Sequence, residues 1–341
     1  MAAKLRKIAV EEAFSIPEVA KELQKVARAP GDSADLPLIR GVYDAQPGYG
    51  SLNFLAGLLD LEGQRLREMD EHSVDMQILS LTAPGVQMFD ADTACDLATL
   101  ANDRLAEVIA RHPKRFAGLA SFPTQSPRRA VKEMERAINK LKLNGFMINS
   151  HTNSEYLDDP KYWPILEAAE ALDRCIYIHP RGASDGLKGP LREYGMDSAM
   201  WGYGVEVGTH VVRMMASGLF DRFPKLKICI GHMGEAVHFW IWRVTFMNSR
   251  SQKIGRAPKT ELTMSEYFQR NFVISSSGHE DPLALEYSVK KLGPDNVLWA
   301  IDYPYQPTAP AVAFLESAPL NAADKAKFAY QNAERIFHIK P

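Results

Sequence analysis

The sequence predicts an α/β fold, a (β/α)8 barrel of the TIM type that forms a single domain over residues 1–341. Three observations predict it. Eight short apolar segments alternate with helical segments, polar residues gather where the apolar segments end, and 341 residues suit one barrel domain. Alternating strands and helices build a parallel sheet, and eight such units close it into a barrel.

The predicted strands are apolar, rich in β-branched residues and bounded by turn or helix signals. In chain order they cover Arg6–Glu12, Asp75–Leu81, Arg115–Ser121, Gly145–Ser150, Cys175–His179, Lys227–His232, Phe272–Ser276 and Val297–Asp302. Helical patterns lie between most of them, at Asp92–Arg111, Pro127–Lys142, Trp163–Leu172, Val205–Leu219 and Glu235–Asn248. The C-terminal segment AADKAKFAYQNAERIFHIK predicts a closing helix with exposed aromatic residues that could support contacts between subunits.

Two insertions decorate this frame. Residues 15–57 follow the first predicted strand, and residues 180–204 follow the fifth. Both leave from the carboxyl ends of strands, the face on which barrel active sites form. We therefore expect both insertions to wall the active-site pocket.

The bulk composition excludes several classes of function. Hydrophobic residues make up 46% of the chain, charged residues 24%, and the formal net charge is -2, which favours neither nucleic acid nor an anionic membrane as partner. The segment MAAKLRKIAVEEAF lacks a signal-peptide core, and no apolar run is long enough to span a membrane. The cysteines Cys95, Cys175 and Cys229 form no CxxC pair, so we expect reduced, buried thiols in a cytoplasmic protein.

The strand ends carry the residues that could do chemistry. Glu11 and Glu12 end the first predicted strand, and alternation sends them to opposite sides, so one of them faces the barrel axis. His179, His232 and Asp302 end the fifth, sixth and eighth. Taken alone, each has an ordinary structural alternative, such as a salt bridge, a cap or a hydrogen-bonded core histidine. Together, two carboxylates and two imidazoles at one barrel mouth favour a Zn, Mn or Mg site.

Six motifs carry a resemblance to a known family. They are IAVEEAF, ILSLTAPGVQ, INSHTNSEYLDDPKYWPI, IYIHPR, GLFDRFPKLKICIGHMGEA and AIDYPYQ. Together they resemble the metal-dependent decarboxylase branch of the amidohydrolase superfamily, over residues 7–337. That branch includes the 5-carboxyvanillate, γ-resorcylate, 2,3-dihydroxybenzoate and salicylate decarboxylases, and the motifs look most similar to the 5-carboxyvanillate enzymes.

The resemblance implies a metal site with one divalent ion, Mn²⁺, Zn²⁺ or Mg²⁺, and no organic cofactor. Its ligands are implied to be Glu11, His179 and Asp302. Ala13 stands where superfamily hydrolases carry a second histidine, and Asn149 stands where binuclear members carry a bridging lysine. These departures favour one ion with open positions for water and a chelating substrate.

The resemblance also implies residues that surround the substrate. His232 is implied to lie beside the metal-bound water and the substrate, with Glu235 orienting a histidine. Arg243 is implied to face the carboxylate or ring substituents of the substrate. Further pocket candidates, each equally compatible with plain structural hydrogen bonding, are Asn149, His151, His279 and Tyr305.

The implied activity is the non-oxidative decarboxylation of an ortho-hydroxy aromatic carboxylic acid, with Asp302 protonating the ipso carbon. The 5-carboxyvanillate enzymes are expected to use an arginine from the first insertion, where this chain has QPGYGSL, which leaves room for a different ortho-hydroxy acid. Family members are implied to form homodimers or homotetramers. The native metal and the physiological direction of the reaction stay open.

Two alternatives remain at this point. A hydrolase or hydratase of the lactonase type could use the same barrel, with metal-bound water as nucleophile, although the EEA sequence and the DYPY ending argue against it. A catalytically inactive barrel could serve as a binding or assembly module, although the complete ligand set argues against that.

Overall fold

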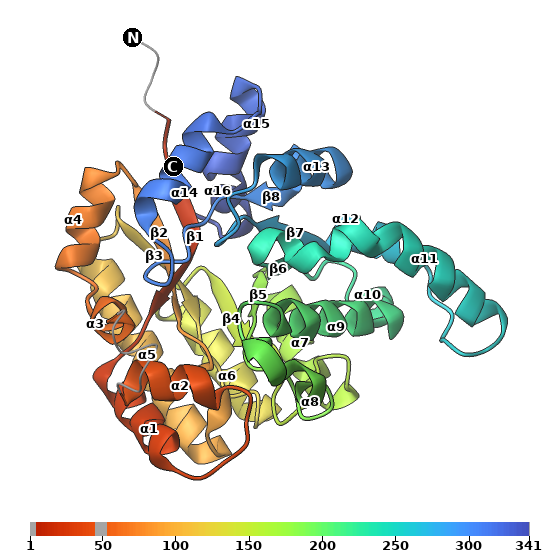
Figure 1. The fold of residues 1–341 in the computed structure, drawn as a ribbon, viewed down its shortest axis with the longest axis horizontal. Helices are drawn as coiled ribbons and strands as arrows, with labels where there is room; N and C mark the ends of the chain where they lie inside the picture. The colour runs from red at the N-terminus through yellow and green to blue at the C-terminus, as the bar shows by residue number, and fades with distance from the viewer. Residues whose placement is uncertain (1–4, 45–52, 341) are drawn as a thin grey trace.

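A closed arrangement of parallel strands forms the centre of the molecule (Figure 1). The computed structural model describes residues 5–44 and 53–340, and within them one sheet runs in the order β1 to β8, each strand paired in parallel with the next. The strands are β1 (Ile8–Phe14), β2 (Met76–Leu81), β3 (Phe116–Ala120), β4 (Gly145–Asn149), β5 (Ile176–His179), β6 (Ile228–Ile230), β7 (Phe272–Ser275) and β8 (Val297–Leu298). The predicted (β/α)8 barrel is confirmed.

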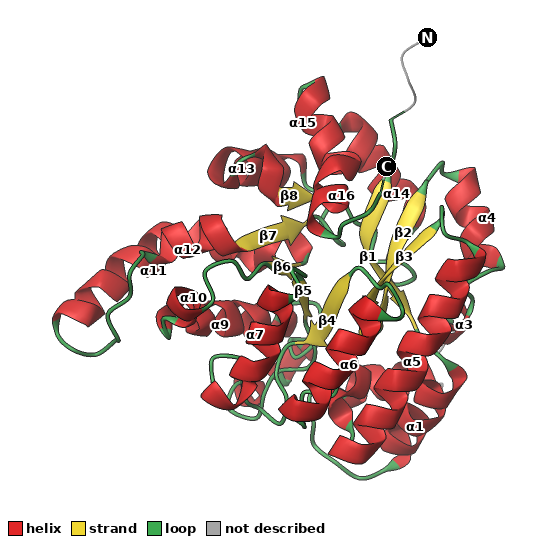
Figure 2. Ribbon diagram, turned by 180° about the vertical axis from the view of Figure 1, so that it is seen from behind, coloured by secondary structure: helices red, strands yellow, loops and turns green. Residues whose placement is uncertain are grey.

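Helices surround the sheet, and Figure 2 shows α5, α6 and α7 lying along its outside. The first eight helices are α1 (Pro17–Arg28), α2 (Leu36–Tyr43), α3 (Phe54–Leu59), α4 (Gln64–Glu71), α5 (Ala91–Arg111), α6 (Pro127–Asn139), α7 (Trp163–Ala171) and α8 (Lys188–Leu191). The others are α9 (Gly202–Ala216), α10 (Leu219–Arg222), α11 (Val237–Lys253), α12 (Met264–Asn271), α13 (Pro282–Leu292), α14 (Thr308–Ser317), α15 (Ala322–Ala326) and α16 (Asn332–Ile336). Local sequence fixes several helix starts: Asp90 caps α5, Asp281 caps α13, and Thr263 forms a capping box at α12.

The strands divide the core into two layers. Outward-facing side chains pack against the helices in one large cluster. Inward-facing ones, among them Val10, Tyr177 and Val273, fill the barrel interior in a second cluster. Strand alternation produces this division, because successive side chains point to opposite faces.

The C-terminal segment closes the barrel interior at the base. It is helical, but a short π-helical stretch at Lys327–Gln331 separates α15 from α16. Ile336, Phe337 and Ile339 belong to the interior cluster, and Phe328 is also buried. The expectation of exposed aromatic residues is therefore wrong for Phe328 and Phe337. Both are buried because this segment packs against the core of the barrel.

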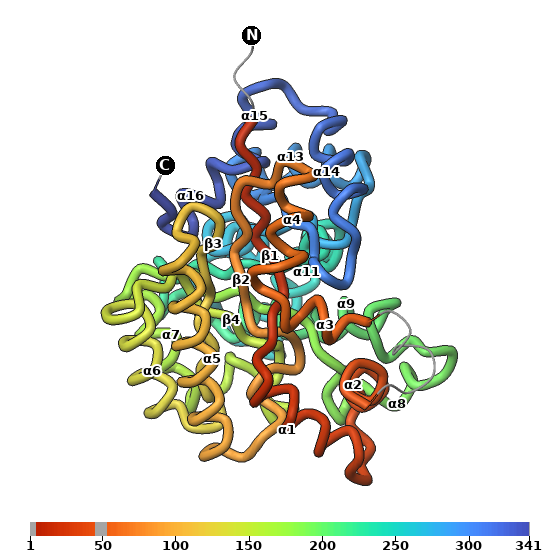
Figure 3. The backbone as a smooth tube through the Cα atoms, turned by 90° about the vertical axis from the view of Figure 1, so that its left-hand side faces the viewer, coloured from red at the N-terminus to blue at the C-terminus, as the bar shows by residue number. Residues whose placement is uncertain are grey.

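The two insertions meet beside the barrel mouth. Lys188 of α8 pairs with Asp32, which precedes α2, at 3.0 Å, and Figure 3 shows α2 and α8 close together although they are far apart in sequence. The stretch QPGYGSL, residues 46–52, lies outside the described residues. Over the described ranges no helix is long and apolar enough to cross a membrane. The three cysteines are free and buried, as expected.

Candidate metal centre and active site

Four side chains from distant parts of the chain converge at the barrel mouth. Glu11 comes from β1, His179 ends β5, His232 follows β6, and Asp302 follows β8. One ligand atom from each lies within 4.8 Å of the others. Glu11 Oε1 is 3.4 Å from His179 Nε2 and 3.5 Å from His232 Nε2.

A change of pairing register in β1 aims Glu11 into the barrel. Ile8 and Val10 face the interior, so strict alternation would send Glu11 outward. The register with β2 shifts between Ala9 and Glu12, as at a β-bulge, and Glu11 contacts the interior residue Tyr177. Glu12 turns instead toward the backbone after β8, so only one of the two glutamates faces the centre.

The hydrogen bonds around Glu11 and His179 leave the ligand atoms free for a cation. Glu11 Oε2 accepts hydrogen bonds from the hydroxyls of Tyr177 and Ser275, the latter at 3.0 Å. Glu11 Oε1 is buried without a hydrogen-bond partner. His179 Nδ1 lies 2.7 Å from the Pro180 carbonyl, which makes Nδ1 the protonated nitrogen and leaves the Nε2 lone pair facing Glu11. An orphaned carboxylate oxygen opposite two imidazole nitrogens fits a divalent ion.

His232 is held by Glu235 in an unusual backbone segment. Its Nδ1 lies 2.7 Å from Glu235 Oε1. Every residue from His232 to Ala236 has a positive φ, between 47° and 69°. A positive φ is energetically unfavourable for residues other than glycine. Such strain is typical of functional sites, where the backbone holds side chains in a required position. The contact is the one that the predicted orienting role of Glu235 requires.

In the absence of a metal ion, the surrounding protein groups shift the pKa values of Glu11 and Asp302 in opposite directions. Burial opposes the charge on Glu11, but His232, His179 and two hydroxyls lower its pKa. Burial and the neighbouring Glu11 charge raise the pKa of Asp302 well above its usual value. Burial lowers the pKa of His179 to about 4, whereas for His232 the carboxylates of Glu11 and Glu235 outweigh burial and raise the pKa to about 10. The lowered pKa favours the ionised form of Glu11, and the raised pKa favours the protonated form of Asp302.

A glycine makes room for the Glu11 carboxylate. A Cβ atom on Gly231 would lie 2.4 Å from Glu11 Oε2 and 2.9 Å from Oε1. We therefore expect Gly231→Ala to displace Glu11 and to weaken Mn²⁺ binding by about 10-fold or more, as loss of ligand support does. Isothermal titration with Mn²⁺ measures this. Gly189→Ala is the matched control, because a Cβ there meets nothing within 4 Å, and equal Mn²⁺ affinities in the two variants would contradict the prediction.

A cavity of about 700 Å³ opens beside the four-residue cluster. His232, Glu235 and His279 line it, together with residues of α9 and α11 that include Val212 and Trp240. Most of the lining surface is apolar, which suits a flat, partly apolar ligand with its polar end at the cluster.

The predicted substrate residues fall into three situations. His279 lines the cavity. Arg243 is exposed on α11 and is not among the residues that line it. Tyr305 is partly buried, with its hydroxyl 2.7 Å from Thr82 Oγ1. These three roles remain predictions.

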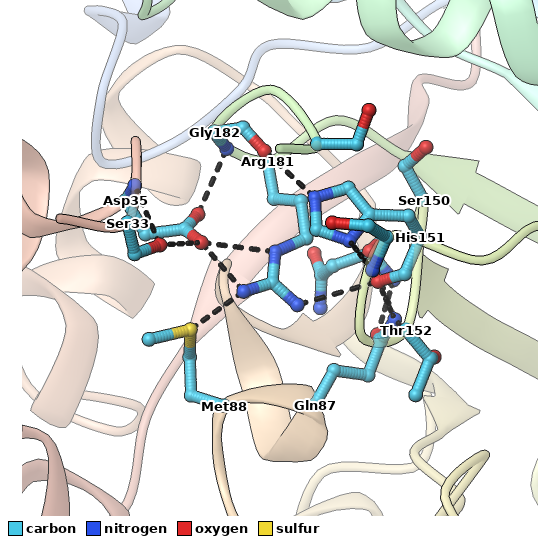
Figure 4. Close-up of polar contacts among 12 residues, drawn as sticks. Ser33, Asp35, Gln87, Met88, Ser150, His151, Thr152, Arg181 and Gly182 are labelled. Atoms are coloured by element: carbon cyan, nitrogen blue, oxygen red, sulfur yellow. Dashed lines mark hydrogen bonds and ion pairs between the residues drawn. The ribbon is translucent and has the colours of Figure 1, made fainter. Parts of the chain in front are cut away.

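Asn149 and His151 lie in a buried network of loop contacts. Asn149 is buried, and its Oδ1 has no hydrogen-bond partner. Both His151 nitrogens are engaged. The Ser154 amide donates to Nδ1, and Nε2 lies 3.0 Å from the Gly182 carbonyl oxygen (Figure 4). The structure thus shows a loop-bridging contact for His151, and its substrate role remains a prediction.

A buried ion pair joins the two insertions close to His179. Arg181 Nη2 lies 2.5 Å from Asp35 Oδ2, and the Gly182 amide donates to Asp35 Oδ1 at 2.8 Å (Figure 4). Both side chains of the ion pair are almost completely buried. Removing one partner would leave a buried charge unpaired, a cost of about 3–5 kcal/mol.

Sequence reasoning missed several residues of this site. Tyr177 could have been found, because it lies two residues before His179 and so shares its strand face. Arg181 stands in the motif IYIHPR but received no role. Its partner Asp35 lies 146 residues away in an irregular loop, where no periodicity signals a contact.

Helix α9 anchors the loops after β4 through a neutral histidine. His210 Nε2 accepts a hydrogen bond from the Leu157 amide at 3.1 Å, and its Nδ1 lies 3.2 Å from Ser150 Oγ. Burial, followed by the charges of His151 and Arg213, lowers the pKa of His210 to about 3.

This pKa predicts a dependence of stability on pH. The unfolded chain binds a proton near pH 6.5, whereas the folded His210 does not until about pH 3, so its contribution is complete above pH 6.5 and falls as the pH drops. We expect about 2 kcal/mol of unfolding free energy to be lost through this group between pH 7 and pH 5. Urea unfolding at both pH values should therefore show a smaller loss for His210→Gln than for wild type. His338→Gln, at a more exposed site, should behave as wild type, and an unchanged loss in His210→Gln would contradict the prediction.

The comparisons with known proteins agree with this geometry. The amidohydrolase family model matches residues 58–339, so the chain belongs to the amidohydrolase family. It is 35% identical over 293 residues to the gamma-resorcylate decarboxylase of Polaromonas sp., which covers 83% of this chain and 89% of that protein.

Solved structures extend the likeness over nearly the whole chain. The 5-carboxyvanillate decarboxylase from Sphingomonas paucimobilis is similar with a TM-score of 0.95 and 52% identity, covering 99% of this chain and 100% of that one. The 5-carboxyvanillate decarboxylase from Novosphingobium aromaticivorans, complexed with manganese and 4-hydroxy-3-methoxy-5-nitrobenzoic acid, has a TM-score of 0.94 and 34% identity, with 99% of each chain covered. The family resemblance drawn from the six motifs is confirmed.

Proposed function

We propose that this protein is a non-oxidative, divalent-metal-dependent carboxy-lyase that decarboxylates an ortho-hydroxy aromatic carboxylic acid, of the hydroxybenzoate type and similar to 5-carboxyvanillate. One observation carries the proposal. The unpartnered Glu11 Oε1, two imidazoles and Asp302 meet at the barrel mouth, and one of these residues, His232, also lines a mainly apolar cavity. The decarboxylase relatives support the same reaction class.

The cofactor in this proposal is one divalent ion held by Glu11, His179 and Asp302, with His232 beside it. The ion supplies Lewis-acid stabilisation of negative charge on the substrate carboxylate and ortho oxygen. Manganese in a relative favours Mn²⁺ over Zn²⁺ or Mg²⁺. No organic cofactor is proposed.

Asp302 is the proton donor in this mechanism. Because Asp302 is also assigned as a metal ligand, it would serve as ligand and as acid in turn, and burial together with the Glu11 charge, which raise its pKa in the absence of the ion, favour its protonated form when it is not a ligand. Transfer of that proton to the ipso carbon forms a C–H bond and converts the negatively charged ortho oxygen into a carbonyl, so the ring loses its aromaticity without gaining a positive charge. The C–C bond to the carboxylate then breaks, CO₂ departs, and the electron pair of that bond restores the aromatic ring.

The remaining polar residues orient the substrate. His232, fixed by Glu235, is placed to hydrogen bond with the ortho oxygen as its charge changes. We assign His279, Asn149, His151 and Tyr305 to substrate contacts around the ring, although the Gly182 carbonyl and the Ser154 amide already engage both nitrogens of His151. Arg243 is assigned to the substrate carboxylate or ring substituents, although it is exposed and does not line the cavity.

A substrate panel tests the proposal. Purified protein loaded with Mn²⁺, Zn²⁺ or Mg²⁺ is offered salicylate, 2,3- and 2,6-dihydroxybenzoate and 5-carboxyvanillate, and both loss of the acid and release of CO₂ are measured. We expect turnover of at least one of these acids. Turnover of a lactone and of no aromatic acid would instead support the hydrolase alternative, which the relatives do not favour. A protein without metal affinity would support an inactive binding module.

We also propose that the chain, as one domain over residues 1–341, works in the cytoplasm as a homodimer or homotetramer. The three free cysteines support the location. Helix α11 extends away from the barrel (Figure 1) and exposes Phe239, Trp242 and Phe246, with the last two stacked at 5.4 Å. A second copy of this chain is the partner that would cover this face. Light scattering after size exclusion should show an oligomer for wild type and a smaller species for Trp242→Glu, and a monomeric wild type would contradict it.

A further inference from the structure

The barrel is closed between β1 and the chain after β8 in an unusual way. Strand β8 ends at Leu298, so residues 299–303 pass β1 as irregular chain. Two direct backbone hydrogen bonds cross this junction in the part of the chain that the structure describes, from Val10 N to Trp299 O at 3.2 Å and from Ala13 N to Tyr303 O at 2.8 Å. A side chain fills the space between them.

That side chain is Glu12, which is completely buried. Its Oε1 accepts a hydrogen bond from the Ile301 amide at 2.9 Å, and its Oε2 accepts one from the Tyr303 amide at 3.2 Å. The two amides stand on either side of Asp302. The carboxylate thus fixes the peptide units before and after the residue that the proposed mechanism depends on.

Asp302 needs such support because its backbone is strained. Its φ is +76°, in the left-handed region that residues with a side chain rarely adopt. A strained residue persists when its surroundings over-determine its conformation. Glu12 supplies two of the constraints, and the Gln306 amide adds a third by donating to Asp302 O at 2.9 Å.

Glu12 does not serve simply as half of a buried ion pair. The nearby guanidinium of Arg65 is used elsewhere, donating to Ala13 O at 2.6 Å and to Gln77 Oε1 at 3.1 Å, and it lies 4.5 Å from the centre of the Tyr303 ring. Burial raises the pKa of Glu12 to about 8, and the Ile301 amide and the more distant Arg65 charge offset this effect only in part. The hydrogen-bonding capacity of Glu12 is directed at the two backbone amides.

We propose that Glu12 is a positioning residue that aims the carboxyl group of Asp302 at Glu11, His179 and His232. This inference rests on the proposed function for its kinetic consequences. Its geometric part concerns metal binding and can be tested without turnover. Glu12 is not one of the four side chains whose ligand atoms converge at the barrel mouth.

The first test is Glu12→Gln. A glutamine accepts one amide N–H through its oxygen but opposes the other with its own NH₂ group, so one of the two links is lost. We expect Mn²⁺ affinity and kcat each to fall about 10- to 100-fold, with KM changed less, as with other groups that orient a metal ligand. Titration calorimetry and the low-temperature electron paramagnetic resonance spectrum of bound Mn²⁺ report the first effect directly.

Glu133→Gln is the matched control. Glu133 is also a buried carboxylate, hydrogen bonded to Asn102 and Arg136 between α5 and α6, away from the junction. We expect this variant to lose stability but to keep wild-type Mn²⁺ affinity, spectrum and kcat. If Glu12→Gln fails to fold, Glu12→Asp replaces it, because the shorter side chain keeps the carboxyl group but cannot reach both amides.

A double-mutant cycle separates positioning from general stability. In an Asp302→Asn background, Glu12→Gln should lower the residual rate less than about 2-fold, because the residue it positions no longer donates a proton. Wild-type Mn²⁺ affinity and kcat in Glu12→Gln would overturn the proposal, as would an undiminished loss in the Asp302→Asn background. Mn²⁺ binding by wild type without turnover of any aromatic acid would refute the proposed function alone.

Discussion

Asp302→Asn should leave a folded protein whose decarboxylation rate is about 100- to 10,000-fold below wild type. The substitution preserves the shape of the side chain but removes the proton that the ipso carbon must receive, and general acid catalysis contributes about 10²- to 10⁴-fold. The burial and the Glu11 charge that raise the pKa of Asp302 make it the group suited to carry that proton. CO₂ release measured with the best acid of the substrate panel gives the rate.

The control for this variant is Asp295→Asn, which changes a solvent-exposed aspartate that pairs with Lys327. Its rate should equal that of wild type. Circular dichroism and thermal unfolding show whether Asp302→Asn is folded. Full activity in folded Asp302→Asn would exclude Asp302 as the proton donor, whatever the substrate.

Removal of the divalent ion should abolish activity and lower stability together. Dialysis against a chelator is expected to reduce the rate by more than about 1,000-fold, because the metal supplies the charge stabilisation that the chain lacks. Mn²⁺ added back should restore the rate. It should also raise the melting temperature, since a ligand at 100 times its dissociation constant adds about 2.7 kcal/mol to the stability of the folded state.

The variant His179→Ala tests the same metal site by removing one of its proposed ligands instead of the ion. It removes the imidazole whose Nε2 faces Glu11 Oε1, so stoichiometric Mn²⁺ should neither raise its melting temperature nor restore its activity. His338→Ala, at the barrel base and pairing only weakly with Asp173 at 3.7 Å, should respond to Mn²⁺ like wild type. A His179→Ala protein that binds Mn²⁺ normally would show that the cluster is not the metal site.

The barrel and its central cluster could be predicted from sequence because both follow from repetition. Eight apolar segments with polar ends bring those ends onto one face, so His179, His232, Asp302 and one of the two glutamates were expected to approach one another, and the family resemblance singled out Glu11. The length of β8 was overestimated, because its apolar residues continue to Ile301 although pairing with β7 ends at Leu298.

What escaped prediction depends on departures from regular geometry. The register change in β1 turns Glu11 inward, although plain alternation from Ile8 and Val10 would have pointed it outward. The run of positive φ from His232 to Ala236 includes four residues other than glycine, so composition gave no sign of it. Contacts between loops that are distant in sequence, such as that of Asp35 with Arg181, produce no periodic pattern in the sequence from which they could be predicted.

The ion pair between Asp35 and Arg181 has a consequence for protein engineering. Each partner belongs to a different segment outside the barrel frame, and neither is accessible to water that could screen a lone charge. Grafting a foreign segment in place of the one that carries Asp35 would leave the charge of Arg181 unpaired two residues from His179, a proposed metal ligand. New substrate ranges are therefore best sought by exchanging both segments as a matched set.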